Sequence, residues 1–298
     1  FYIQDGVKTY TSSEEILNLR KQFLEGKKPA GCVRCWKDEA AGYPSKRQID
    51  YNNFTTELDR YDLSSQDRIL FFDIPMGNFC NLKCRICNPG ASTTWIKEWK
   101  DLFGEKFKTQ DWHQNPKVWN DLISYTKDSL EIHVSGGEPF LYDTSTHLDL
   151  LDSLIQSNSS KNIKLHYNTN GTVFPKEDYW EKWKSFRWVD VSLSIDDMEQ
   201  RFEYNRHPAN WDTVKENLLQ YRNRIVMRKN MQLSISTTVS AFTIFYLEEF
   251  FDFMSANCIP EPWLGRLNHP HHYRASVFPD HVKEKIREKL QNSKYTNI

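Results

Sequence analysis

The amino-acid sequence predicts an α/β fold, built from six consecutive βα units and a small N-terminal appendage. From about residue 68 onward, apolar strand-like runs alternate with amphipathic helical runs, and this alternation repeats six times. Residues 1–67 lack the alternation, so we expect two regions, an appendage at 1–67 and a region of βα units at 68–298. Units of this kind form either an open doubly wound sheet or a partial (β/α)6 barrel of parallel strands. Both arrangements place functional residues at the carboxyl ends of the strands.

Each predicted strand is a short apolar run that is followed by a segment of helical periodicity. Strands are predicted at 68–76, 129–135, 163–170, 188–196, 231–240 and 262–268. Helices are predicted at 92–103, 117–127, 145–156, 176–186, 211–226, 244–256 and 280–291. Several of them repeat apolar residues at spacings of three and four, as Leu148, Leu151 and Leu154 do, which predicts one buried face. In the appendage a helix is predicted at 13–24, followed by a cysteine pair and a polar stretch.

Composition narrows the class of protein. With 298 residues, of which 39% are hydrophobic, the chain can bury a substantial core. A formal net charge of -1 provides no global attraction to nucleic acid or to an anionic membrane. No apolar run reaches about 18 residues, and the opening segment lacks the pattern of a secretory signal. We therefore expect a soluble, cytoplasmic protein with no membrane partner and no strong nucleic-acid signal. Because the chain begins with Phe1, we also expect it to be trimmed.

The cysteines are clustered rather than spread along the chain. Cys32 and Cys35 form one group, Cys80, Cys84 and Cys87 form another, and Cys258 stands alone. Tight clusters of this kind are typical of metal binding in a reducing compartment rather than of a disulfide framework.

The second cysteine group lies directly after the first predicted strand. Cys80, Cys84 and Cys87 fall within eight residues, which allows three thiolates to surround one inorganic cluster. A [4Fe-4S] cluster usually takes four cysteine ligands, so three would leave one iron open to an outside ligand. The alternative is a structural zinc site, which would need a fourth protein ligand.

A glycine-rich segment, Ser135-Gly136-Gly137-Glu138-Pro139, lies directly after the second predicted strand. Paired glycines let a ligand approach the backbone closely, and Glu138 offers a carboxylate to an ammonium group. Because the ends of neighbouring parallel strands converge, this segment and the three-cysteine loop are expected to share one site.

Together the three-cysteine loop, the Gly-Gly-Glu-Pro segment and the six βα units resemble the radical S-adenosylmethionine (SAM) superfamily, whose fold is a partial barrel. The resemblance implies that Cys80, Cys84 and Cys87 hold a [4Fe-4S] cluster whose fourth iron is chelated by SAM. It also implies that Gly136, Gly137 and Glu138 bind the methionine moiety of SAM, and that Ile86 contacts adenine.

Further segments resemble the same family at later strand ends. By resemblance, Asn168 and Asn170 belong to a Thr-Asn-Gly segment after the third strand, and Ser194 meets the SAM ribose after the fourth. Asp197 stands where the family usually has glycine. The resemblance also implies that Arg206 reaches the SAM carboxylate, for which a planar fork is suited. On the fifth strand, Thr237 and Thr238 resemble the edge that meets adenine.

The N-terminal cysteines lie in a segment that is similar to one in radical SAM proteins of the SPASM/twitch kind, which carry auxiliary Fe-S clusters. Cys32 and Cys35 are therefore predicted to take part in an auxiliary metal site. Two cysteines cannot complete a cluster, so further ligands must come from upstream residues, from Cys258 or from the substrate. A zinc half-site, a redox pair or spare thiols remain the alternatives.

The resemblance implies oxidoreductase-type radical chemistry: an external one-electron donor of the flavodoxin or ferredoxin type reduces the cluster, SAM is cleaved to methionine and a 5′-deoxyadenosyl radical, and the radical removes a substrate hydrogen. The predicted substrate is a peptide or protein. The alternatives are a nucleoside, a sugar or another small metabolite as substrate, or a non-catalytic Fe-S sensor or scaffold. Glu138 argues against a sensor, which has no need of a site for the SAM amine.

Overall fold

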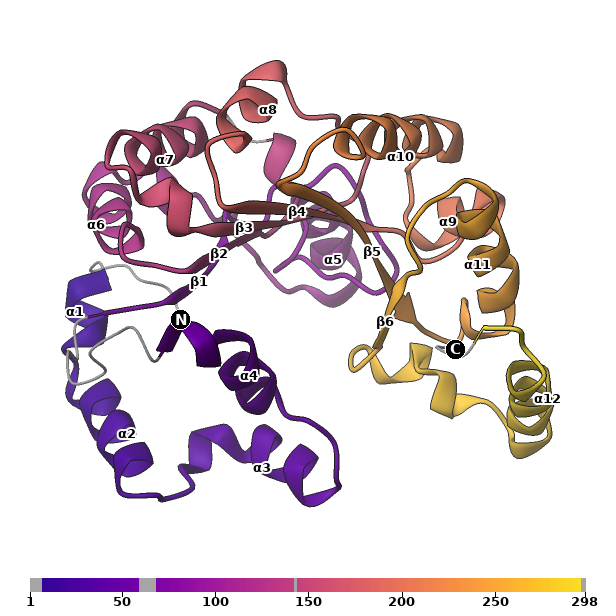
Figure 1. The fold of residues 1–298 in the computed structure, drawn as a ribbon. Helices are drawn as coiled ribbons and strands as arrows, with labels where there is room; N and C mark the ends of the chain where they lie inside the picture. Colours follow the sequence, from indigo (N-terminus) through magenta and orange to yellow (C-terminus); the bar gives the residue numbers. More distant parts are fainter. Residues whose placement is uncertain (1–6, 59–67, 142–143, 296–298) are drawn as a thin grey trace. The chain divides into compact units, whose positions relative to one another are not determined.

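The computed structural model describes residues 7–58, 68–141 and 144–295 (Figure 1). The chain folds into two compact units. One takes residues from 1–69 together with 116–125, and the other takes residues from 70–115 and 126–298. Within the described ranges, no helix is long and apolar enough to cross a membrane.

The second unit is built on a six-stranded parallel sheet, which confirms the predicted fold class. The strands are β1 (Phe71–Pro75), β2 (Glu131–Ser135), β3 (Lys164–Thr169), β4 (Trp188–Ser194), β5 (Met231–Val239) and β6 (Trp263–Arg266). They lie side by side in chain order, and every neighbouring pair is parallel. A doubly wound sheet reverses its strand order at a switch point, whereas an unbroken order is that of a barrel. The sheet is therefore a half-barrel, and all six predicted strands are confirmed.

Helices follow the strands as predicted. In the second unit they are α5 (Ile96–Phe103), α7 (Thr144–Gln156), α8 (Glu177–Trp183), α9 (Glu199–Asn205), α10 (Trp211–Ile225), α11 (Leu247–Ala256) and α12 (Asp280–Gln291). Figure 1 shows α7, α8 and α10 along one face of the sheet. The sequence did not predict α9, because its seven residues are too few to show helical periodicity. The N-terminus of α10 is capped by Asn210, whose side chain accepts a hydrogen bond of 2.9 Å from the amide of Thr213.

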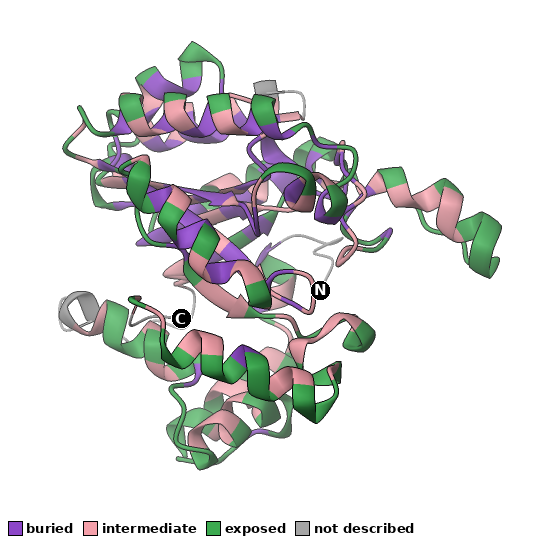
Figure 2. Cartoon of the chain, turned by 90° about the vertical axis from the view of Figure 1, so that its right-hand side faces the viewer, coloured by how far each residue is buried: buried purple, intermediate pink, exposed green. Residues whose placement is uncertain are grey.

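The core lies between the sheet and its helices, as the purple residues of Figure 2 show. Side chains of successive strand residues point to opposite faces, so alternate positions differ in burial. One set is apolar and buried, including Ile132, Leu165 and Val191. Each such side chain stabilises the fold by about 1.5–3 kcal/mol. The other set includes His133 and His166, which are half-buried and polar. The half-barrel thus has one apolar face and one polar face.

The first unit is helical. Its elements are α1 (Val7–Thr11), α2 (Glu14–Leu24), a short 3-10 turn at Ala30–Cys32, α3 (Val33–Ala40), α4 (Lys46–Leu58) and α6 (Pro116–Thr126). The helix predicted at 13–24 is confirmed as α2. No helix was predicted at the cysteine pair or in the polar stretch after it, where α3 and α4 form. Helix α3 has only eight residues, fewer than the window in which helical periodicity is recognised, and the sequence of α4 is mostly polar.

Candidate functional site

The three cysteines of the central group lie on one loop after β1. Cys80 and Cys84 are buried and Cys87 is half-buried, and all are free thiols. The loop is held by its own hydrogen bonds. The amide of Cys87 donates to the carbonyl of Cys84 at 3.0 Å, and the indole of Trp95 donates to the same carbonyl at 3.1 Å. The loop is therefore ordered by the protein itself.

A second segment is paired with this loop. The amide of Lys83 donates to the carbonyl of His207 at 2.6 Å, and the amide of Arg85 donates to that of Asn205 at 2.9 Å. Because the two bonds flank Cys84 on one side and Arg206 on the other, Cys84 and Arg206 lie opposite each other, as in an antiparallel pair. The segment after α9 thus brings a guanidinium group to the cysteine loop.

The glycine pair after β2 packs directly against the cysteine loop. Gly136 and Gly137 have φ angles of +86° and +54°, which residues with side chains rarely adopt. A Cβ atom on Gly137 would lie 2.0 Å from the carbonyl oxygen of Phe79, the residue before Cys80. The amide of Glu138 donates to this same oxygen at 2.9 Å. Glycine is therefore required here for the close approach of two strand ends.

Glu138 is fully buried at the centre of the site. Its carboxylate accepts hydrogen bonds from the Thr169 hydroxyl at 2.8 Å, the Asn170 amide at 2.6 Å and the Phe140 amide at 3.2 Å. Burial nevertheless raises the pKa of Glu138 to about 7, against the opposing effect of these bonds. No cationic side chain is hydrogen-bonded to this carboxylate among the described residues, so it is suited to receive an ammonium group.

Asn170 connects the third strand end to the cysteine loop. Its Nδ2 lies 3.7 Å from the Cys80 sulfur and 3.0 Å from the Oδ1 of Asn81, and its Oδ1 accepts from the Thr172 amide at 2.9 Å. Asn168 lies two residues earlier on β3 and is half-buried. The Asn170 amide group therefore stands as a donor toward one of the predicted cluster ligands.

The ends of β4 and β5 form the remaining side of the site. Arg206 is ion-paired with Asp196, whose Oδ2 lies 2.9 Å from Nε and 2.8 Å from Nη2 of the guanidinium. The other oxygen of Asp196 accepts from the Thr238 amide at 2.8 Å, while the hydroxyl of Thr237 donates to the carbonyl of Ile195 at 2.6 Å. These hydrogen bonds connect the ends of β4 and β5 next to the cysteine loop.

Ser194, Ile86 and Asp197 complete the predicted positions. Ser194 ends β4 and is half-buried, as is Ile86 in the cysteine loop. Asp197 is buried and accepts from the Nε of Arg201 at 3.0 Å. Burial raises the pKa of Asp197 to about 6. The loop therefore accommodates Asp197, in place of the glycine usual in the family, through an ion pair with the next helix.

The residues present fit a cluster of the kind that the sequence predicts. Cys84 and Cys87 share a hydrogen bond, which, together with burial, raises the pKa of Cys84, whereas the same bond lowers the pKa of Cys87. Burial raises the pKa of Cys80. In the described part of the chain, no three His, Cys, Asp or Glu side chains converge on a single metal ion. A [4Fe-4S] cluster makes a different demand, because each cysteine binds its own iron. Three thiols on one ordered loop can bind three irons, and Asn170 donates toward the sulfur of Cys80.

Two features of this unit were not predicted from the sequence. The first is Asp196, the partner of Arg206. The second is a polar row on the strands, in which Nε2 of His133 lies 2.6 Å from Glu131 and Nδ1 of His166 lies 2.8 Å from Asp190. The two imidazole rings are 4.4 Å apart. The sequence does show the polar row, as polar residues at alternate strand positions. The same alternation is expected of any solvated sheet face, so it did not identify a functional surface.

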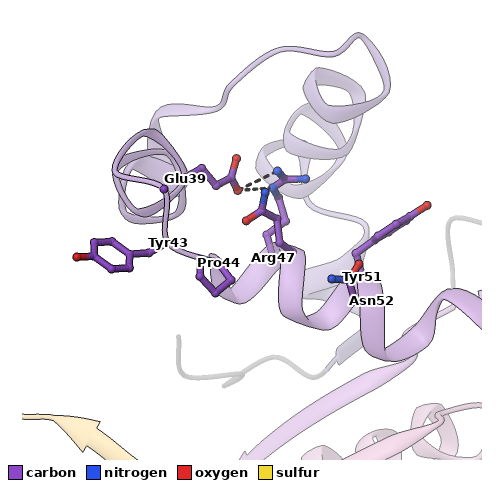
Figure 3. Close-up of a pocket in the computed structure, with 8 residues that line it drawn as sticks. Glu39, Tyr43, Pro44, Arg47, Tyr51 and Asn52 are labelled. Carbon is purple, nitrogen blue, oxygen red and sulfur yellow. Dashed lines mark hydrogen bonds and ion pairs between the residues drawn. The ribbon is translucent and has the colours of Figure 1, made fainter. Parts of the chain in front are cut away.

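In the first unit, Cys32 and Cys35 are half-buried at the start of α3. The sequence that follows them forms a small network, because Glu39 accepts from the Ser45 hydroxyl at 2.6 Å and from Arg47 at 2.8 Å. Figure 3 shows Glu39 and Arg47 pointing toward each other at a pocket of about 640 Å³. The pocket lies within this unit and is lined by Glu39, Gly42, Tyr43, Pro44, Arg47, Gln48, Tyr51 and Asn52. Cys258 is exposed and belongs to the other unit.

A half-barrel of parallel strands with three cysteines after its first strand defines a class of enzyme that works with an inorganic cluster at its strand ends. The sequence profile of the radical SAM superfamily matches residues 74–236, more than half of the chain. The chain belongs to the radical SAM superfamily and is an enzyme of that class.

Solved structures agree at the level of the fold. The chain is similar to native anSMEcpe with bound AdoMet and Kp18Cys peptide, at a TM-score of 0.50 and 16% sequence identity over 70% of this chain and 54% of that one. It is also similar to Streptococcus suis SuiB, at a TM-score of 0.50 and 16% identity over 87% of this chain and 56% of that one. The chain thus spans little more than half the length of these proteins. A search of the curated proteins found no match.

Proposed function

We propose that this enzyme reductively cleaves SAM at a [4Fe-4S] cluster held by Cys80, Cys84 and Cys87, and abstracts a hydrogen from a peptide substrate. When bound, the cluster and SAM supply the electron transfer and the organic radical. The observation that carries the proposal is the convergence of three strand ends: the buried Glu138 carboxylate after β2, the Asn170 amide after β3 and the cysteine loop after β1 are directly linked. An external electron donor of the flavodoxin or ferredoxin type completes the cycle.

The chain's own residues bind and orient SAM. Glu138 receives the ammonium group, and Gly136 and Gly137 let the ligand approach the backbone. Asn168 and Asn170 line the site from β3, and Ser194 meets the ribose.

Arg206 binds the SAM carboxylate through its Nη1 atom, because Asp196 occupies Nε and Nη2. Ile86, Thr237 and Thr238 lie at the predicted adenine edge, where the Thr238 amide is already bound to Asp196.

We place the chain in the SPASM/twitch-like subgroup, with 1–67 as a module for an auxiliary cluster and 68–298 as the catalytic region. Cys32 and Cys35 would supply two of its ligands. Two thiols at the start of one helix, with the network around Glu39 holding the segment that follows, support this proposal. A peptide substrate is supported by the peptide in the anSMEcpe structure and by the polar row of the half-barrel, which offers hydrogen-bonding groups to a ligand.

The test is anaerobic reconstitution with iron and sulfide, reduction in the presence of SAM, and detection of 5′-deoxyadenosine. We expect the Cys80→Ala/Cys84→Ala/Cys87→Ala variant to produce none, and any turnover by it would refute the proposed site. Iron retained by this variant would belong to the auxiliary site, and its loss on adding Cys32→Ala and Cys35→Ala would assign the ligands.

Glu138→Gln provides a sharper test of SAM binding. This variant keeps the size of the side chain but removes the charge, so we expect it to load iron normally and to bind SAM at least tenfold more weakly. Asp121→Asn, in α6 of the other unit, is the matched control. Unchanged SAM affinity in Glu138→Gln would contradict the assigned role of the carboxylate.

A further inference from the structure

The buried ion pair of Arg206 and Asp196 lies beside the cysteine loop. The guanidinium side chain is 9% exposed and the carboxylate 5%. Hydrogen bonds from Lys83 and Arg85 hold the backbone on both sides of Arg206 against the residues on both sides of Cys84. A charge in this position is removed from water and fixed in place, so solvent and salt screen its field only weakly.

The pair acts on the sulfurs as a positive charge. Burial opposes the charge of Arg206, but Asp196 and the neighbouring cysteines outweigh burial, so the pKa of Arg206 is raised and the group stays ionised. The paired backbones place Arg206 directly opposite Cys84, whereas the two oxygens of Asp196 are bound to the guanidinium and to the Thr238 amide. Because Arg206 is the member of the pair that adjoins the cysteine loop, the two charges do not cancel at the place where the cluster would sit.

We propose that the Arg206–Asp196 pair sets the reduction potential of the cluster, with Arg206 raising the potential and Asp196 limiting that rise while it holds the guanidinium in place. This inference rests on the proposed function, since it requires a cluster on the three cysteines. The physical reason is general: reduction adds one negative charge to the cluster, and a nearby positive charge stabilises the reduced form. Charge and hydrogen bonding around the sulfurs are known determinants of cluster potential.

The proposal gives Asp196 a role as a positioning residue that holds Arg206 next to the cysteine loop. Its two oxygens are divided between the guanidinium and the Thr238 amide, so it also fixes the guanidinium relative to β5. If the pair were needed only for folding, replacing either residue would destabilise the protein and would not shift the potential according to charge. If the pair sets the potential, removing the positive charge and removing the negative charge shift the potential in opposite directions.

The experiment measures the midpoint potential of the reconstituted, SAM-free holoenzyme by titration monitored with electron paramagnetic resonance. Arg206→Gln leaves Asp196 unbalanced, so we expect the lowest potential. Asp196→Asn leaves Arg206 unbalanced, so we expect the highest. The double variant Arg206→Gln/Asp196→Asn removes both charges and keeps two side chains that can hydrogen-bond each other, and its potential should lie between those of Arg206→Gln and the wild type.

Two further variants separate charge from geometry and from long-range effects. Arg206→Lys keeps the charge but loses the planar fork, so its potential should stay close to that of the wild type even if its affinity for SAM falls. Arg287→Gln removes an exposed cation of α12 that is paired with Glu284, and it should leave the potential unchanged.

The order of potentials decides the matter. Equal potentials in all variants with full iron content, or a shift in the same direction for Arg206→Gln and Asp196→Asn, would overturn the inference. If an uncompensated single variant does not fold, the double variant and Arg206→Lys still test it, because their potentials must differ. Absence of a cluster in the wild-type protein would refute the proposed function instead, whereas SAM cleavage with the wrong order of potentials would refute only this inference.

Discussion

Replacing Gly137 with alanine tests whether the close packing of the second strand end on the cysteine loop is what builds the site. The new Cβ would lie 2.0 Å from the carbonyl oxygen of Phe79, against a lower limit of 3.0 Å for real Cβ contacts. The backbone that leads to Cys80 must therefore move by at least about 1 Å, the difference between the two distances. Because this neighbour is backbone, no side-chain rotation can relieve the contact.

The expected cost has two parts. Holding a non-glycine residue at a φ of +54° costs about 1–2 kcal/mol. Crowding of the packed loop adds about 1–3 kcal/mol. We therefore expect Gly137→Ala to lower the free energy of unfolding by about 2–5 kcal/mol and to load markedly less iron, because the loop that carries Cys80 is displaced.

The chain offers matched controls for this change. Gly104 ends α5 at a φ of +70° and has nothing within 4 Å of an added Cβ, so Gly104→Ala isolates the conformational part. For Gly136 the nearest contact is 2.7 Å, so its variant should fall between the other two. Urea unfolding and iron content per chain provide the measurements. If Gly137→Ala matches Gly104→Ala in both, steric contact with Phe79 does not shape the site.

Three other predictions concern the scaffold. Burial lowers the pKa of His147 to about 3, below its unfolded value of 6.5, so acid favours the unfolded chain. From pH 7 to pH 5 this effect should cost about 2 kcal/mol of stability. The raised pKa values of Glu138 and Asp197 act in the opposite direction, so the cost is measured as the difference between urea titrations of the wild type and of His147→Gln. Trp180→Ala, in the fully buried aromatic core, should cost about 3–5 kcal/mol in the same assay, whereas Trp263→Ala, at a 69% exposed side chain, should cost little. Lys83→Ala breaks a partly exposed ion pair with Glu98 and should change stability by less than about 1 kcal/mol, and a larger loss would mean that the pair also shapes the loop.

The sequence identifies the strands and the residues at their ends because both leave local signals. A buried parallel strand is a short apolar run, and Gly136, Gly137 and Glu138 follow such a run directly. Chain order then becomes spatial order, because each strand pairs with the next one along the chain. Residues far apart in sequence, such as Cys80 and Asn170, are therefore brought together by a rule that the sequence alone supplies.

Pairing between side chains does not follow from that rule. The sequence predicted that Arg206 reaches the SAM carboxylate, but it did not predict that Asp196 binds two of the nitrogens of Arg206. The position opposite Cys84 depends on how the segment after α9 returns to the cysteine loop, and α9 itself has no recognisable periodicity. Helices α3 and α4 were not predicted for reasons of their own, because α3 has too few residues to show helical periodicity and the sequence of α4 is mostly polar.

The proposed cofactor site and the polar row lie on different parts of each strand. The loop residues of the proposed SAM site have narrow requirements, such as glycine at a positive φ and a buried carboxylate. The polar row is built from mid-strand residues, and His133 and His166 precede Ser135 and Asn168 by two positions on the same strands. In each of the two imidazoles, one nitrogen is hydrogen-bonded to a carboxylate. The other nitrogen can accept a hydrogen bond from a ligand. Variation in this row would change the groups that the half-barrel offers to a ligand without changing the loop residues of the proposed cluster and SAM site, so the motifs that identify the superfamily do not specify a substrate.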